Sequence, residues 1–291
     1  MAVYARTYRS YAGPFVSERA RLFVLTRYGL ADLFRSKAFL ALFVLCFVPT
    51  VVAMVRIYLA HNAEFLDMFN VPSQAVEQLL AISGSFFRGW VLVPAAVAAF
   101  WIALFGGASL VSPDFRNNAM PLYLARPLSR SEYLAGKLLA LLIPMCAVTL
   151  APALLLFGLQ CLFAGAAWIG DYAWVGASLV VAILAWNLVI ALFSLALAAW
   201  VKWRPVARLL MIALPLLASA FGHAANGIFG TTWGLVLSFW SILGAIWESL
   251  LRLPENTATL SAGTAWVMLT LVGLASLGLF YRRIKAYEVE R

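Results

Sequence analysis

Long apolar runs alternate with short polar segments along most of this chain. A helix needs about 20 apolar residues to cross the hydrocarbon core of a bilayer. Runs of that length lie at Ala38–Ala60, Gly89–Val111, Leu138–Ala164, Tyr172–Val201, Val206–Ile228 and Ala262–Tyr281. The pattern predicts an all-α membrane protein whose transmembrane domain, 38–281, contains six spans.

A seventh apolar run, Trp233–Leu251, is assigned from the distribution of charge. All but three of the 21 Lys and Arg residues lie in the N-terminal segment, in the loops 112–137 and 202–208, or in the tail 282–291. Because cations gather on the cytoplasmic side, we expect both termini in the cytoplasm. An even number of spans follows, so the seventh run should not cross the membrane. A true seventh span is the alternative.

The pattern of 233–252 favours a helix that lies in the outer interface before the last span. One helical face carries Ser238, Ser241, Ala245, Glu248 and Arg252, and the other carries Phe239, Leu243, Ile246, Trp247 and Leu250. A helix with one polar and one apolar face is suited to the boundary between water and lipid.

A second amphipathic helix is predicted within the N-terminal segment 1–37, with Ser17 as its N-cap. Its apolar or small stripe consists of Leu22, Thr26, Gly29, Leu30, Leu33 and Phe34. Its charged positions include Arg21, Arg27, Asp32 and Arg35. The basic balance suits the anionic inner leaflet. Simple anchoring and a mechanical role both fit this pattern.

Composition agrees with a membrane protein and excludes several kinds of site. The chain is 64% hydrophobic and 11% charged, against roughly 25% charged residues in soluble domains. The net charge of +9 follows the two membrane sides and does not indicate nucleic-acid binding. The three cysteines lie in apolar runs, and His61 and His223 have no neighbour at ligand spacing, so neither a disulfide framework nor a metal site is expected.

The sequence also lacks the groups that would power transport or catalysis. No Asp, Glu or Lys lies near the centre of a predicted span, which disfavours a carrier coupled to an ion gradient. Gly136-Lys137 resembles the end of a P-loop, but Leu138 follows it and no glycine stands five residues before Gly136. We therefore expect no nucleotide binding, no cofactor and no enzymatic activity in this chain.

The polar segment 112–137 separates two of the apolar runs. Ser129 and Glu132 have capping-box spacing, and Pro127 disfavours helix just before them, so a helix should begin at Ser129–Arg130. It would start in water and enter the bilayer near Leu138. Upstream, the apolar side chains of 120–124 need a groove to bury them, which indicates a protein partner.

The stretch Ala125-Arg-Pro-Leu-Ser-Arg-Ser-Glu-Tyr-Leu-Ala-Gly-Lys137 resembles the Arg-Pro-(Leu/Ile/Val)-Ser-Arg…Gly-Lys signature of the type-two permease family of ATP-binding-cassette (ABC) exporters. The segment 114–119 is similar to the acidic stretch that follows the second span in that family. Here Ser112-Pro113-Asp114 and Asn117-Asn118 stand where the family often has Gly-Glu and Gly-Thr pairs.

The resemblance implies a permease subunit of a bacterial inner-membrane exporter. A separate cytoplasmic ATPase, carrying ATP and Mg, would bind the polar segment, and a second permease copy or paralogue would complete the pathway. The N-terminal amphipathic helix would be the family's elbow helix, with Arg21, Arg27, Asp32 and Arg35. The expected docking or coupling residues are Asp114, Arg116, Leu122, Tyr123, Arg126, Pro127, Arg130, Glu132 and Tyr133.

Two other classes of function stay open at this point. A non-transporting transmitter would relay ATP hydrolysis to an extracytoplasmic partner, although the outer loops offer little surface for one. An ion-coupled secondary carrier is disfavoured by the missing charges at mid-membrane. For Arg126 and Arg130, anchoring to inner-leaflet phosphates is the alternative to docking.

Overall fold

The computed structural model describes residues 18–62, 82–120, 123, 129–254 and 260–285, with the backbone alone at 18–21 and 285. These residues are almost entirely helical, and no strand occurs among them. The predicted all-α class is therefore confirmed. Ser17, Leu122, Arg126 and Pro127, which the sequence singled out, lie outside the described residues, as does the side chain of Arg21.

The described elements, in chain order, are as follows. They are α1 (Glu18–Arg35), α2 (Lys37–Leu45), α3 (Val48–His61), α6 (Gly84–Phe86), the π-helix η1 (Phe87–Leu92), α7 (Val93–Arg116), α9 (Arg130–Val148), α10 (Leu150–Trp200), α11 (Arg204–Phe229), the 3-10 helix η2 (Trp233–Leu237), α12 (Phe239–Leu250) and α13 (Ala262–Lys285).

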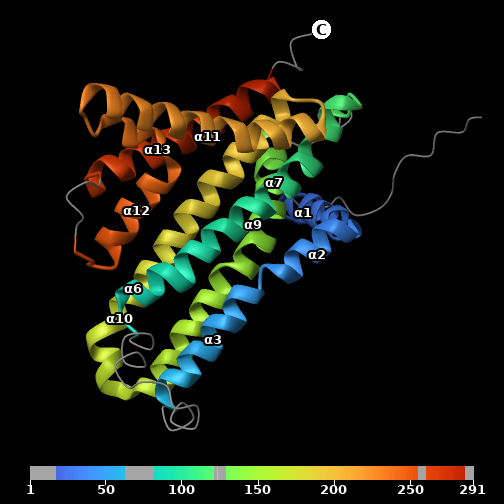
Figure 1. Cartoon of the computed structure of the whole chain (residues 1–291). Helices are drawn as coiled ribbons and strands as arrows, with labels where there is room; N and C mark the ends of the chain where they lie inside the picture. The colour runs from blue at the N-terminus through green and yellow to red at the C-terminus, as the bar shows by residue number, and fades with distance from the viewer. Residues whose placement is uncertain (1–17, 63–81, 121–122, 124–128, 255–259, 286–291) are drawn as a thin grey trace, which may run out of the picture.

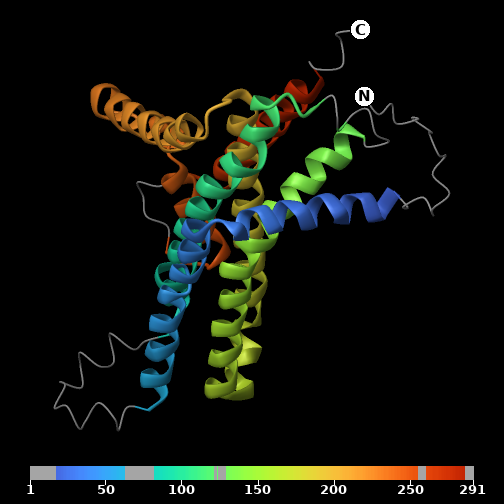
Figure 2. The ribbon, with the colours of Figure 1, turned by 90° about the vertical axis from the view of Figure 1, so that its right-hand side faces the viewer.

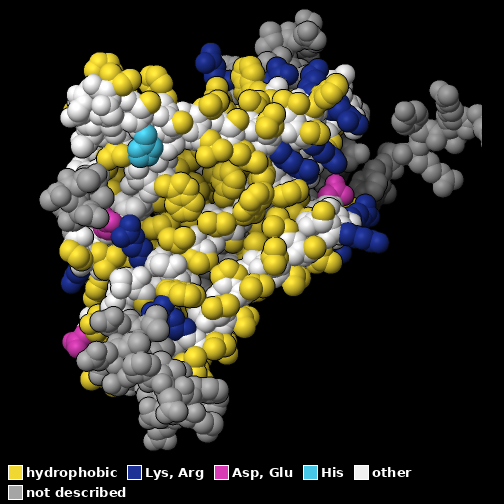
Figure 3. Space-filling model, viewed as in Figure 1, with side chains coloured by type: hydrophobic (Ala, Val, Ile, Leu, Met, Phe, Trp, Pro, Cys, Tyr) yellow, Lys and Arg dark blue, Asp and Glu magenta, His cyan; other side chains and the backbone are white. Residues whose placement is uncertain are grey.

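Helices α3, α7, α9 and α10 form a steep bundle, and α1 lies across it (Figures 1 and 2). The ends of α7, α10 and α13 and the start of α9 meet at one end of this bundle. On the face drawn in Figure 3, Lys and Arg side chains gather over that same end. Many of the cations that the sequence places in separate segments therefore lie near one another at this end of the structure.

Five helical elements in the described part of the chain are long and apolar enough to cross a membrane, which indicates a multi-pass membrane protein. Two of them, Gly84–Arg116 and Arg130–Trp200, have 67% of their most apolar stretch buried. In the other three, the buried share falls to 11%, 17% and 28%. The first pair therefore forms the centre of the protein, and the other three present apolar side chains outward, as lipid contact requires.

Helix α10 reverses direction at Gly165. This residue has φ 83° and ψ −179°, a conformation open to glycine because it has no Cβ. The region Arg130–Trp200 is an apolar element of 71 residues, far longer than the about 20 residues that cross a bilayer once. The third and fourth predicted spans lie on either side of the reversal (Figure 1). The total of six spans stays a prediction.

The run Trp233–Leu251 does not form a spanning helix. It divides into the 3-10 helix η2 and the 12-residue α12, each too short to cross. Its expected polar face is not turned to water, however. Glu248 is buried and pairs with Arg88 at 2.9 Å, because the Arg88 side chain of η1 reaches the side of α12 that carries this carboxylate.

Glycine allows the two central elements to approach closely. A Cβ on Gly107 of α7 would overlap the Oγ and Cβ of Ser194 on α10. That hydroxyl donates to the carbonyl of Ala103 at 2.6 Å. Ser194 therefore cannot rotate away from Gly107 without leaving its own buried hydroxyl donor unpaired.

We expect Gly107→Ala to destabilise the protein by about 1–3 kcal/mol, the usual range for an overpacked core. Gly158→Ala is the matched control, since nothing lies within 4 Å of the Cβ it would add and alanine favours a helix by up to about 1 kcal/mol over glycine. Thermal unfolding of both variants in the same detergent checks this. Equal midpoints would contradict the close α7–α10 contact.

Candidate functional site

Helix α9 begins where the sequence predicted. The amide of Ser129 donates to Glu132 Oε2 at 2.6 Å, and the amide of Glu132 donates to Ser129 Oγ at 3.2 Å. Both halves of the capping box are therefore present, and α9 starts at Arg130. A helix fixed at this point holds the remainder of the polar segment at its N-terminal end.

A charged cluster joins the end of α7 to the first turns of α9. Lys137 Nζ lies 2.7 Å from Asp114 Oδ2 and donates to the carbonyl of Leu110 at 2.8 Å. The hydroxyl of Tyr133 donates to the same Asp114 oxygen at 2.8 Å. One carboxylate thus accepts from two side chains of α9, and one ammonium bonds twice to α7.

Burial makes this cluster a firm connection. The side chains of Lys137 and Asp114 are only 8% and 15% exposed, and Tyr133 is buried. Removing one partner of a buried ion pair leaves an uncompensated charge, which costs about 3–5 kcal/mol. Separation of the α7 and α9 ends would incur a penalty of the same kind, so the two ends are expected to move together.

Lys137 was not among the expected site residues. It ends the signature-like stretch 125–137 and begins an apolar run, but its position alone names no partner. A lone lysine entering an apolar helix needs a partner, and that need was the available signal. Asp114, which follows the preceding apolar run, is the partner of Lys137, but only the packing of α7 against α9 brings the two side chains together.

The end of α7 also contacts two further helices. Ser112 donates to the carbonyl of Ala198 on α10 at 3.1 Å. The guanidinium of Arg283 on α13 lies 5.8 Å from the ring of Phe115 and 5.4 Å from that of Trp200. Residues 112–116 are therefore a junction at which α7, α9, α10 and α13 meet.

Helix α1 packs directly on α9. A Cβ on Gly29 would lie 2.8 Å from the Cβ of Ala140, and one on Gly136 would lie 2.6 Å from a methyl group of Leu25. Thr26, which is buried, donates to the carbonyl of Gly136 at 3.4 Å. The stripe predicted on α1 therefore faces α9, while Arg27, Asp32 and Arg35 are exposed.

The other predicted residues divide by exposure. Arg116 is exposed, whereas Arg130 and Glu132 are half-buried at the start of α9. Tyr123 packs on Tyr133, with ring centroids 5.4 Å apart. The structure brings Asp114, Tyr123 and Tyr133 together inside the protein, so these three position the segment rather than form its outer surface.

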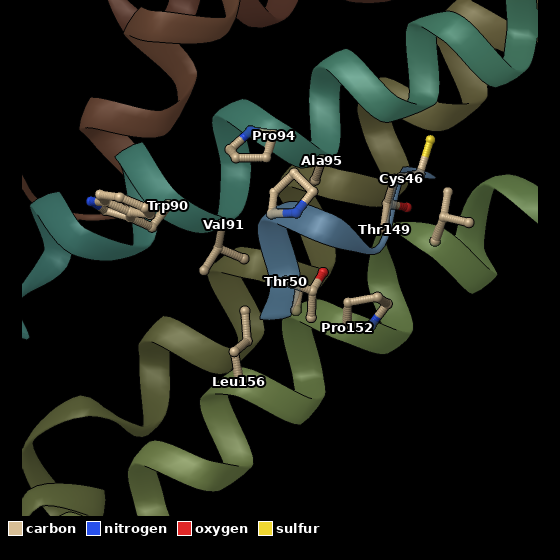
Figure 4. Close-up of a pocket in the computed structure, with 12 residues that line it drawn as sticks. Cys46, Thr50, Trp90, Val91, Pro94, Ala95, Thr149, Pro152 and Leu156 are labelled. Carbon is tan, nitrogen blue, oxygen red and sulfur yellow. The ribbon is translucent and has the colours of Figure 1, made fainter. Parts of the chain in front are cut away.

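The starts of three elements lie around one small crevice in the middle of the bundle (Figure 4). The crevice has a volume of about 20 Å³. Pro49, Pro94 and Pro152 line it, together with Thr50 and Thr149. Each of these prolines lies in the first turn of its element, where the missing amide donor removes no intrahelical hydrogen bond. Elements α3, α7 and α10 therefore all begin at this one proline layer.

No protein-family model matches the chain, and no curated protein matches it. The resemblance to the type-two permeases therefore rests on the polar segment 112–137 and on the predicted order of spans. Within the described residues, no group of three or more His, Cys, Asp or Glu side chains is placed to hold a metal ion.

A double-mutant cycle tests the buried pair. We expect Lys137→Met to destabilise the protein by about 3 kcal/mol, because Asp114 then stays buried without its cation. Asp114→Asn should cost a similar amount. The double variant should lose less than the sum of the single losses, since it buries no unpaired charge.

Thermal or denaturant unfolding in detergent measures each variant. Arg282→Gln is the control, as it removes an exposed cation at the same end of the bundle and should change stability by no more than about 0.5 kcal/mol. Additive losses in the double variant would show that the two charges do not interact.

Proposed function

We propose that this chain is the membrane permease subunit of an ABC exporter, driven by a separate cytoplasmic ATPase. The observation that carries the proposal is the way the polar segment 112–137 joins the surrounding helices. A segment with the family's signature is tied through buried bonds to α7 and continues into a membrane helix. A force applied to such a segment moves helices rather than a loose loop.

The contacts support a route for that force. The capping box fixes the start of α9, and the Lys137–Asp114 pair transmits a displacement of α9 to the end of α7. From there Ser112 reaches α10, and the close contacts at Gly29 and Gly136 reach α1. The proline layer farther along the bundle is where α3, α7 and α10 would bend in response.

In this proposal α10 supplies two spans, one on each side of Gly165, which brings the total to six. Helix α1 is the elbow helix at the inner interface, α12 lies in the outer interface, and both termini lie in the cytoplasm of a bacterial cell. The partner ATPase carries ATP and Mg, and a second permease copy or paralogue completes the pathway.

Docking is tested by reversing charge. We expect the chain to copurify with an ATPase and to lose it when Arg126 and Arg130 are both changed to Glu. The two new carboxylates then repel the group that the two cations bound. The matched control is Lys202→Glu with Arg282→Glu, which reverses two exposed cations at the same end. Unchanged association and unchanged stimulated ATPase activity in the docking variant would rule out this surface.

Coupling is tested separately from docking. The variant with both Asp114→Asn and Lys137→Met should keep the ATPase bound, since neither side chain lies on the outer surface. It should lose most of the transport-linked stimulation of ATP hydrolysis, because α7 no longer follows α9. Copurification measures the first and ATPase assays in proteoliposomes measure the second. Full stimulation in a stably folded double variant would refute the proposed route.

The non-transporting transmitter is the second candidate, favoured by the same junction. It predicts ATPase association without movement of any solute. Transport assays in proteoliposomes, set against capture of an extracytoplasmic partner, separate it from the exporter. Gradient-driven uptake in the absence of any ATPase would instead support a secondary carrier.

A further inference from the structure

A polar cavity opens at the basic end of the bundle, and Leu110, whose carbonyl accepts from Lys137, is part of its lining. It has a volume of about 270 Å³ and lies between the end of α1, α2, α7 and the first turns of α11. Arg35, Arg204 and Arg208 line it, with Asp32 as the one acidic side chain. Cations therefore outnumber anions in the lining by three to one.

These cations lack full compensation from protein carboxylates. Asp32 lies 3.7 Å from Arg35, and both side chains are more than 70% exposed at 75% and 83%, so the pair is weak. Among the described residues, no carboxylate pairs with Arg204 or Arg208. These two arginines are four residues apart on one helix, where like charges repel. An anion between them would relieve that repulsion.

Arg208 is held in place as if to receive such an anion. Its guanidinium lies 4.7 Å from the centroid of the Phe105 ring, and one terminal nitrogen donates to Ser109 Oγ at 3.3 Å. Its Nε is buried and has no hydrogen-bond partner in the described part of the chain. Arg208 also lines the cavity, so its charge is available to an anion bound there.

The rest of the lining is apolar and adjoins the lipid-facing surface. Leu33 and Phe39 are buried, and Phe105 and Leu110 complete this apolar part. Helices α2 and α11, which border the cavity, are also among the elements with little buried surface. A ligand with an anionic head and an apolar body matches this division better than a free anion does.

We propose that this cavity binds the phosphate headgroup of an anionic phospholipid from the inner leaflet. Arg204 and Arg208 contact the phosphate, Arg35 closes the rim, and the acyl chains lie along α2 and α11. Basic pockets between membrane helices on the cytoplasmic side are suited to acidic headgroups. The proposal needs no ATPase and stands apart from the exporter function.

The test uses the full chain in neutral detergent, titrated with phosphatidylglycerol and followed by native mass spectrometry and thermal shift. The variant with both Arg204→Gln and Arg208→Gln should bind this lipid at least about tenfold more weakly, since each arginine contributes a charge-assisted bond. Arg204→Gln alone should weaken binding in the same direction. Because that side chain is exposed, its removal leaves the packing intact.

The matched control is Lys202→Gln with Arg282→Gln, which removes the same charge from the same end without touching the cavity lining. It should bind phosphatidylglycerol within about twofold of the parent, on the scale of an exposed charge. Equal loss in the control and the cavity variant would overturn the site. So would equal binding of phosphatidylcholine. Saturation by inorganic phosphate that blocks phosphatidylglycerol would overturn the lipid assignment in favour of a soluble anion.

Discussion

The buried pair between Lys137 and Asp114 is the interaction on which the basic end of this protein depends. A charge in an apolar helix cannot be left alone, and each of these side chains supplies the other's only short-range ion pair among the described residues. The pair fixes how far α9 advances relative to α7, because a shift along either helix would separate the charges. Tyr133 and the carbonyl of Leu110 then satisfy the remaining bonding capacity of the pair.

Close uncharged contacts also fix the positions of the neighbouring helices relative to α7 and α9. Glycines let α1 approach α9 and let α7 approach α10, so backbone meets side chain with little room for adjustment. Closely packed elements transmit displacement because they cannot be compressed. The proline layer around Pro49, Pro94 and Pro152 is the opposite case, since α3, α7 and α10 each begin there. The proposed route of force therefore runs from a stiff end to a layer at which three elements begin.

The partners of the positively charged side chains differ between the two ends of the bundle. The three cations expected on the outer side each have a partner: Arg88 pairs with Glu248, Arg56 lies 4.9 Å from the ring centroid of Trp90, and Arg252 lies 4.6 Å from that of Trp174. At the basic end, Arg208 also packs on an aromatic ring, that of Phe105, but it and Arg204 line a cavity and pair with no carboxylate among the described residues. Paired cations serve packing, whereas uncompensated ones at the expected inner face are available to anionic headgroups.

The sequence by itself determined the helical class, the presence of several apolar helices, the start of α9 and the stripe on α1, because these follow from local periodicity and from capping within a few residues. It also separated the short run at Trp233–Leu251 from the spans. Only the tertiary structure decided that Lys137 meets Asp114, that Glu248 turns inward to Arg88, and that α11 and α1 enclose a basic cavity. Those contacts join residues far apart in the chain, and their existence depends on how whole helices pack, which no local pattern specifies.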